Sequence, residues 1–381
     1  QRSDEALHMD LAIGPEQRGL LLEAPYFPRG ARRLSSRSVQ TRVNPRTLLR
    51  ESAQVAQNTF YPRHYGVETQ KPLQDLSVFC QRTGLDQAGV ESLLSIETCT
   101  PVASPNVVGL DDASPARFGS VYINAGLEPV MGVASDDGKH SLIDASDDHF
   151  DRIQRMVRLA RWLDLSFGET DQIIDAALRA EYGEAGRGQA ISDNTLRALG
   201  LFCRLRRDFK VSAEDFAALL QGVALYARGG EQPQFDRVFN DPSLFSEPLV
   251  LDDSAFSIVP GSDAEYRKIL HLCGALGIGF DTYLYVARYI AQAGSDQQRV
   301  RDGEGETLLW SHAVISAFYR FTRLAAWIGL TSIEVIALLQ LMGRRGHHYV
   351  ARLVTPALAV YQHSDLSDTL SVVQGLTCLL Y

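Results

Sequence analysis

The spacing of apolar residues predicts helices along most of the chain. In residues 307–328 apolar side chains recur every three or four positions, which places them on one helical face: Trp310, Val314, Ala317, Phe321, Leu324 and Ile328. The same spacing predicts helices from Asp148 onwards and shorter ones between Asn44 and Ser95. We therefore predict a mainly α fold, an irregular multi-helix (αα-hairpin) assembly with a small β-hairpin insertion and a long structured loop.

A short phrase recurs where one predicted helix ends and the next begins. It joins an apolar residue, a polar residue or glycine, a second apolar residue and, in most copies, a helix-capping residue: Leu163–Ser166, Phe209–Ser212, Leu276–Gly279 and Ile328–Thr331, with Thr83–Asp86 as a looser copy. Three copies carry the residues of a capping box: Ser166 with Glu169, Ser212 with Asp215, and Thr331 with Glu334. Each copy predicts a tight turn between helices. Because the copies are irregularly spaced, a strict repeat array is not expected.

Helical spacing stops between Glu97 and Asp148, where proline and glycine are frequent. Ser120–Asn124 and Glu128–Val133, joined around Ala125-Gly126, predict a small β-hairpin, and Asp136–Lys139 predicts another turn. These patterns divide the chain into a basic N-terminal helical segment (residues 1–96), a small β and loop insertion (97–148) and a helical domain (149–381) with a structured loop at 229–263.

The stretch Gln232–Ile269 is the longest one without helical spacing in the C-terminal two thirds. Its four prolines and several aspartates favour turns, but it is also rich in large apolar residues. A flexible linker would be poor in such residues. We therefore expect an ordered connection that acts as a brace, with Phe235, Phe239 and Phe245 buried between the preceding and following helix pairs.

Charge and cysteine usage narrow the possible functions. The net charge of −9 argues against a general nucleic-acid binder, and the five scattered cysteines predict no disulfide framework. No segment approaches the roughly 18–20 uninterrupted apolar residues of a membrane-spanning helix. The chain starts without Met and ends on an apolar run, so both ends look like cuts through a longer protein.

Arginines are unevenly distributed. Residues 29–50 are locally basic, and Arg29, Arg33 and Arg37 are possible contacts for an acidic partner or a neighbouring subunit; a solvated face is the other interpretation. A second group, Arg152, Arg155, Arg158 and Arg161, follows a helical stripe. For this stripe we expect a solvated or salt-bridged face.

Sequence motifs for catalysis are missing. The chain has no Walker A loop, no G-x-G-x-x-G after a strand, no G-x-S-x-G elbow and no H-E-x-x-H. His347, His348 and His363 form the densest histidine group, but no acidic or thiol ligand stands at metal spacing beside them. We expect no catalytic residue, no metal site and no cofactor.

Several phrases, in this order, resemble the A subunit of bacterial insecticidal toxin complexes (Tc toxins) and the related Salmonella virulence-plasmid A proteins. They are FYPRHYGV (60–67), FDRIQRMVRLARWLDLSFGETDQII (150–174), QFDRVFNDPSLF (234–245) and IVPGSDAEYRKIL (258–270). The second resembles the family's R-h-x-R-L helix, where h is an apolar residue. The third resembles its Q-F-D-R-L-F-x-x-P phrase. The hallmark residues of that phrase are Phe235, Asp236, Arg237, Phe239, Asn240 and Pro242.

The resemblance implies a fragment of the α-helical shell of a very large, secreted, pentameric toxin subunit. Such a subunit would assemble with other copies of itself and with the toxin B and C components, and would help to deliver a toxic enzyme into host cells. Some relatives insert a β-domain, proposed to bind receptors, before the R-h-x-R-L helix; here only residues 115–148 stand at that position. The alternative is a helical module that binds a host receptor, a glycan or a partner subunit.

Overall fold

The computed structural model describes residues 11–23, 26–27, 59–110, 118–186, 189–294, 307–342, 349–358 and 368–379. The helices are α2 Pro15–Leu22, α4 Leu76–Thr83, α5 Gln87–Leu94, α6 Val121–Asn124, α7 Asp147–Leu163, α8 Phe167–Tyr182, α9 Asp193–Phe209, α10 Ala213–Leu220, α11 Gln234–Phe239, α12 Asp263–Leu276, α13 Phe280–Ala293, α14 His312–Ile328, α15 Ser332–Met342, α16 Tyr349–Val354 and α17 Thr369–Leu379. The predicted mainly α class is therefore confirmed.

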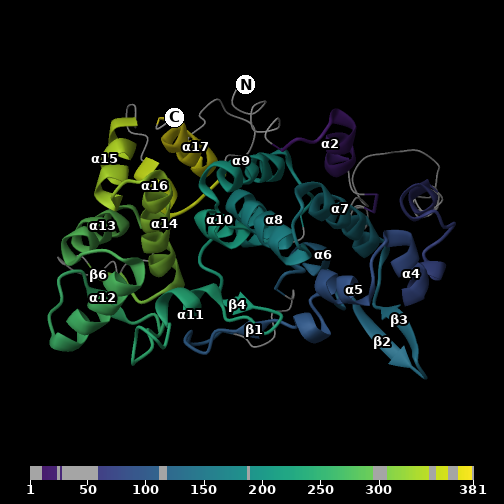
Figure 1. Cartoon of the computed structure of the whole chain (residues 1–381), viewed down its shortest axis with the longest axis horizontal. Coiled ribbons are helices and arrows are strands. Elements are labelled where there is room, and N and C mark those ends of the chain that lie inside the picture. Colours follow the sequence, from purple (N-terminus) through teal and green to yellow (C-terminus); the bar gives the residue numbers. More distant parts are fainter. Residues whose placement is uncertain are drawn as a thin grey trace, which may run out of the picture.

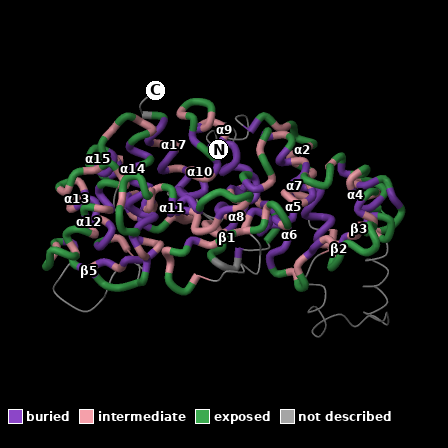
Figure 2. Tube along the Cα trace, turned by 60° about the horizontal axis from the view of Figure 1, so that its bottom comes forward, coloured by how far each residue is buried: buried purple, intermediate pink, exposed green. Residues whose placement is uncertain are grey.

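The helices follow one another along the long axis of the molecule, as Figure 1 shows. α4 and α7 lie towards one end, α8, α9 and α10 in the centre, and α12–α16 at the other end. Figure 2 shows the buried positions running through the interior of this arrangement. One cluster of buried apolar side chains extends from Leu11 to Leu376, so the described helices share a continuous core.

Within the described residues the strands form three small antiparallel sheets. β1 (Val102–Ala103) pairs with β4 (Tyr226–Ala227), β2 (Gly132–Asp136) with β3 (Lys139–Ile143), and β5 (Ala255–Ser257) with β6 (Thr307–Leu309). Only the second pair is a local hairpin. The other two join segments that are far apart in the sequence.

The predicted hairpin was placed wrongly. Residues Val121–Asn124 form the short helix α6, and the hairpin lies at β2 and β3, around the turn predicted at Asp136–Lys139. In that turn Asp137 and Gly138 both have positive φ, 46° and 78°, which is the conformation that a two-residue hairpin loop needs. α6 depends on distant residues, described below, that the local pattern does not reveal.

All five recurring phrases form the predicted turns. In each copy the second residue follows the last helical residue and adopts the left-handed backbone conformation. The backbone N–H of the next, apolar residue then donates to a carbonyl in the last turn of that helix, as in a Schellman motif. At Gly277, for example, φ is 66°, and the Ile278 N–H donates to the Cys273 carbonyl at 3.0 Å. The two pairs α12–α13 and α14–α15 bend by 97° and 91°, so these neighbours form right-angled corners.

The capping boxes formed in two of the three predicted places. The carboxylate of Glu169 accepts a hydrogen bond from the backbone N–H of Ser166, and that of Glu334 accepts one from the backbone N–H of Thr331. Ser212 caps the Asp215 N–H at 3.1 Å, but the Asp215 carboxylate accepts hydrogen bonds from Tyr319 and Gln234 instead. The shorter aspartate side chain is therefore used for tertiary contacts.

Candidate functional site

The hallmark phrase lies in and after α11, between α10, α12 and α14. α11 is a helical turn inside a stretch expected to be a loop throughout, so that expectation was wrong for Gln234–Phe239. Phe235 and Phe239 are fully buried as predicted, with ring centroids 5.4 Å apart. Phe245 is only half-buried, because it stacks on His271 at the surface of α12 with a centroid distance of 3.8 Å.

The polar hallmark residues form a local network. Asp236 Oδ1 accepts hydrogen bonds from the side-chain amides of Asn106 at 2.8 Å and Asn240 at 3.1 Å. Asn240 also bonds both backbone groups of the buried Leu249. Leu251, two residues on, exchanges backbone hydrogen bonds with the segment around Asn106, so these contacts join three separate stretches of chain.

Gln234, the first residue of the phrase, is hydrogen-bonded to residues of α10 and α14. The Gln234 side chain accepts the Ala224 N–H at 2.9 Å and donates to Asp215 at 3.1 Å and to the Tyr319 hydroxyl at 3.0 Å. Arg237 forms an ion pair with Glu214 of α10. Pro242 is exposed and lies beyond these contacts.

The first two members of the arginine stripe of α7 are buried. The expectation of a solvated or salt-bridged face was wrong for Arg152, whereas Arg155 is salt-bridged but not exposed. Arg152 is 9% exposed and Arg155 is 2% exposed. Arg152 donates to the carbonyls of Tyr122, Ile123 and Ala125 at the end of α6. Arg155 donates to the last turn of α2 and is paired with Asp151. Each guanidinium thus neutralises the partial negative charge at a helix C-terminus.

Arg320 of α14 also donates hydrogen bonds to helix C-termini, here in the centre of the fold. It is 2% exposed and donates to the carbonyls of Ala218 and Gln221 at the end of α10 and of Leu353 and Val354 at the end of α16. Burial lowers the pKa of its guanidinium to about 9. Arg228, which follows β4, similarly donates to Ser92 and Ser95 at the end of α5.

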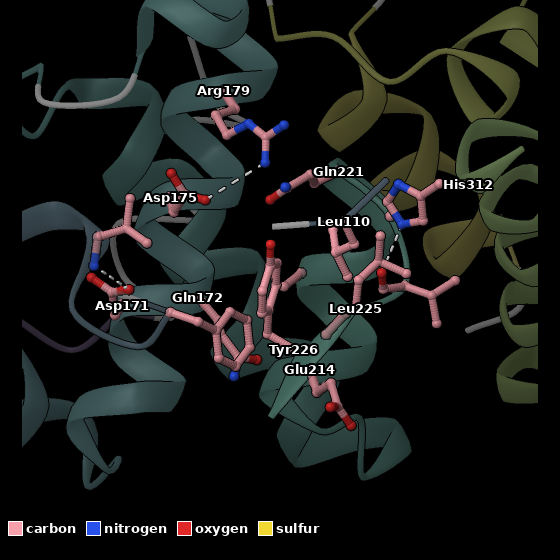
Figure 3. A pocket seen from close by; sticks show the side chains of 16 residues that line it. Leu110, Asp171, Gln172, Asp175, Arg179, Glu214, Gln221, Leu225, Tyr226 and His312 are labelled. Carbon is pink, nitrogen blue, oxygen red and sulfur yellow. Dashed lines mark hydrogen bonds and ion pairs between the residues drawn. The ribbon is translucent and has the colours of Figure 1, made fainter. Parts of the chain in front are cut away.

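A cavity of about 250 Å³ lies between α8, α10 and β4. Asp171, Asp175 and Arg179 face it from successive turns of α8, as Figure 3 shows. Gln221 reaches it from the end of α10, and Tyr226 from β4. The carboxylate–guanidinium pair of Asp175 and Arg179 is 3.9 Å apart. The sequence analysis did not predict this site. The one pattern in the sequence that could have indicated it is the four-residue spacing of Asp171, Asp175 and Arg179 on α8.

Asp171 connects this cavity to α6. Its carboxylate is buried and accepts the backbone N–H groups of Val121 at 2.9 Å and Tyr122 at 2.8 Å, at the start of that helix. Burial, reinforced by repulsion from Asp175, raises its pKa to about 7, although the two N–H groups and Arg228 act in the opposite direction. α6 is therefore held by Asp171 at one end and by Arg152 at the other.

His312 borders the opposite side of the cavity. Its Nε2–H donates to the Val223 carbonyl at 2.7 Å, which leaves Nδ1 as the ring's acceptor. Burial lowers the pKa of the imidazole to about 4, so the ring is neutral at pH 7. A neutral imidazole, carboxylates, amides and a phenol together favour a polar ligand.

The remaining predicted site residues fall outside the described residues. These are the possible partner contacts Arg29, Arg33 and Arg37, and the histidines His347, His348 and His363. In the part of the chain that the structure describes, no group of His, Cys, Asp and Glu side chains is arranged to hold a metal. None of the five cysteines forms a disulfide bond in the described part of the chain. Over the same residues, no single helix is long and apolar enough to cross a membrane, although the two bent pairs α12–α13 and α14–α15 meet those criteria as pairs.

No protein-family model matches the chain. Among curated proteins, the toxin subunit YenA1 of Yersinia entomophaga is 29% identical over 342 residues, which cover 86% of this chain. The chain spans 28% of the length of that relative.

Two solved structures are also similar. Yersinia pseudotuberculosis TcaA–TcaB aligns with 59% of this chain and 11% of its own, at 17% identity and a TM-score of 0.41. Morganella morganii TcdA4 aligns with 74% of this chain and 12% of its own, at 16% identity and a TM-score of 0.43. Since both TM-scores lie below 0.5, the relationship rests on the sequence match to YenA1, and that match confirms the resemblance of this chain to the A subunits of the Tc toxins.

Proposed function

We propose that this chain is part of the α-helical shell of a secreted, pentameric Tc toxin A subunit, where its role is structural and it carries out no catalysis of its own. The observation that supports this most is the match to a toxin subunit over 86% of the chain. The whole subunit would assemble as a homopentamer, bind the toxin B and C components and deliver a toxic enzyme into host cells.

In this role the hallmark phrase acts as a brace. It contacts α10 through Gln234 and Arg237, α14 through Tyr319, and the segment around Asn106 through Asp236. α12 joins the same contacts, since His271 donates to the Phe239 carbonyl at 2.6 Å. A brace of this kind keeps the helices on its two sides in a fixed relative position.

The basic segment before α4 would supply an intersubunit contact. Arg29, Arg33 and Arg37 carry charge suited to an acidic surface on a neighbouring subunit or on another toxin component. Their replacement by Ser should weaken assembly more at low salt than at high salt, because screening removes exposed charge pairs.

Mass photometry of the full-length protein that contains this chain tests the proposal. We expect a species with the mass of five copies. A Phe239→Ala variant should reduce the five-copy fraction, whereas Pro242→Ala, at an exposed position of the same phrase, should not. A full-length protein that remains a single copy at micromolar concentration would overturn the pentameric assignment.

A further inference from the structure

Helix α15 is apolar on both its inner and its outer side. Its inner side carries three buried residues of the core: Val335, Ile336 and Leu339. Its outer side carries three exposed apolar residues spaced four positions apart, which we call the α15 stripe: Ile333, Ala337 and Leu341. Leu341 is 81% exposed and Ile333 36%. A surface helix normally keeps its outer side polar, and a helix that is apolar all round is normally buried.

The polar residues beside the α15 stripe are used within the fold. Glu334 is the only charged residue of α15, and its carboxylate accepts the backbone N–H of Thr331 at 2.8 Å, which caps the helix. The side-chain amide of Gln340 donates to the hydroxyl of Tyr289 on α13 at 2.6 Å. The stripe is therefore an aliphatic surface whose polar neighbours already have partners.

The neighbouring helix α13 shows the usual pattern. It lies at the same end of the molecule, as Figure 1 shows. Its exposed side carries two charged residues and an amide: Asp281, Arg288 and Gln292. The aliphatic outer side is thus a property of α15 and not of every helix at this end. An exposed apolar stripe of this kind marks a surface that packs against another element.

The order in which the helices pack indicates what covers the stripe. From α12 to α17 each helix packs against the next one in the chain, and α15 also contacts α17. Consecutive elements of one chain usually lie side by side. Because this chain spans 28% of the length of YenA1, a subunit of that length has many further elements that can pack in the same way.

We propose that the α15 stripe is the docking surface for an apolar helix of the same A subunit, from the part of that subunit outside this chain. A helix fits because residues four positions apart form a ridge that packs into the groove of a second helix. The absence of charge in the stripe suits a permanent contact, whose centre is apolar. The inference rests on the proposed function, since it needs a longer subunit, but not on the number of copies in the assembly.

The test replaces Leu341 of the full-length protein by the photo-reactive residue p-benzoylphenylalanine. Irradiation should join residue 341 to one segment outside residues 1–381 of the same copy. The product should therefore keep the mass of one chain on a denaturing gel, and peptide mass spectrometry identifies the segment. The same replacement of Arg288, exposed on α13, is the matched control and should give no defined product.

Two outcomes of the photo-crosslinking would overturn the proposal. A product with the mass of two chains would mean that a neighbouring copy covers the stripe. A yield no higher than that of the Arg288 control would mean that the stripe faces water. A full-length protein that remains a single copy would contradict the pentameric assignment and still allow the crosslink within one chain, so the two proposals fail separately.

Ala337→Cys, a smaller change at the centre of the stripe, provides a second measurement in the full-length protein. Its alkylation by a maleimide should be at least about tenfold slower than that of Arg288→Cys, because the reagent reaches a covered residue only when the contact opens. Peptide mass spectrometry measures both rates separately from those of the native cysteines. Equal rates at the two positions would overturn the proposal.

Discussion

Gly168 lies directly against the guanidinium of Arg228. A Cβ placed on Gly168 would stand 2.2 Å from Nη2 and 2.6 Å from Nε of that arginine. Gly168 is at the start of α8, and Arg228 passes it to reach the end of α5. The absence of a side chain at residue 168 therefore allows an arginine from one part of the fold to cap a helix in another.

Gly168→Ala should destabilise the protein by about 1–3 kcal/mol, the usual cost of an overpacked site, although alanine is the better helix former. Chemical denaturation measures the change in unfolding free energy. Gly19→Ala in α2, where nothing lies within 4 Å of a new Cβ, should be neutral or stabilising. If displacement of Arg228 is the cause, Gly168→Ala should cost much less in an Arg228→Ala background; additive losses would contradict it.

Asn240→Ala tests the polar part of the brace. Asn240 accepts the Leu249 N–H at 2.7 Å and donates to the Leu249 carbonyl at 3.2 Å, as a neighbouring strand would. Because Leu249 is buried, its backbone groups would be left without partners, and the loss should be about 2–3 kcal/mol. Amide hydrogen exchange at Leu249 should accelerate. Unchanged protection at Leu249 would show that the side chain does not hold this backbone.

Arg320→Met removes the donors for the ends of α10 and α16. Four carbonyl groups would lose their arginine, and we expect a loss of about 3–5 kcal/mol, with faster exchange in the last turn of both helices. Arg320→Lys keeps the charge but has fewer donors, so its loss should be smaller. Arg267→Met, at an exposed position of α12, is the control. Equal losses for the Met variants at both positions would exclude a special role for Arg320.

Asp171 should make folding stability depend on pH. Its folded-state pKa of about 7 lies above its ordinary value, so the folded state binds the extra proton between about pH 4 and 7. Its contribution to stability is therefore present at low pH and is lost as the pH rises through 7. His312 acts in the opposite direction, because its lowered pKa makes stability fall as the pH drops from about 6.5 to 4.

The difference between wild type and Asp171→Asn isolates the Asp171 contribution. The asparagine side chain cannot titrate, so the variant should lack the decline in stability between pH 4 and 7, whatever its absolute stability. Denaturant unfolding of both proteins at four or five pH values measures this. Parallel pH profiles would show that Asp171 has an ordinary pKa.

Local residue patterns were enough to predict much of the helical framework. The turn phrases succeeded because the left-handed C-terminal residue, the following apolar residue and the N-cap all act within a few positions of one another. The burial of Phe235 and Phe239 could also be predicted, since large aromatic side chains in a proline-rich connection need a core. The hairpin error arose because α6 is capped by Asp171 and Arg152, which lie far away in the sequence.

What the sequence by itself determined is the mainly α class, the helix boundaries at the recurring turns and the likeness to Tc toxin A subunits, since each depends on residues close together or in a fixed order. Only the tertiary structure decided which arginine side chains are buried and which groups they contact. Arg155 and Arg320 look in the sequence like surface charges, and they are buried because helix ends that are distant in the chain offer them unpaired carbonyl groups. The cavity that Asp171 borders is likewise formed by α8, α10 and β4, so no single segment could have revealed it.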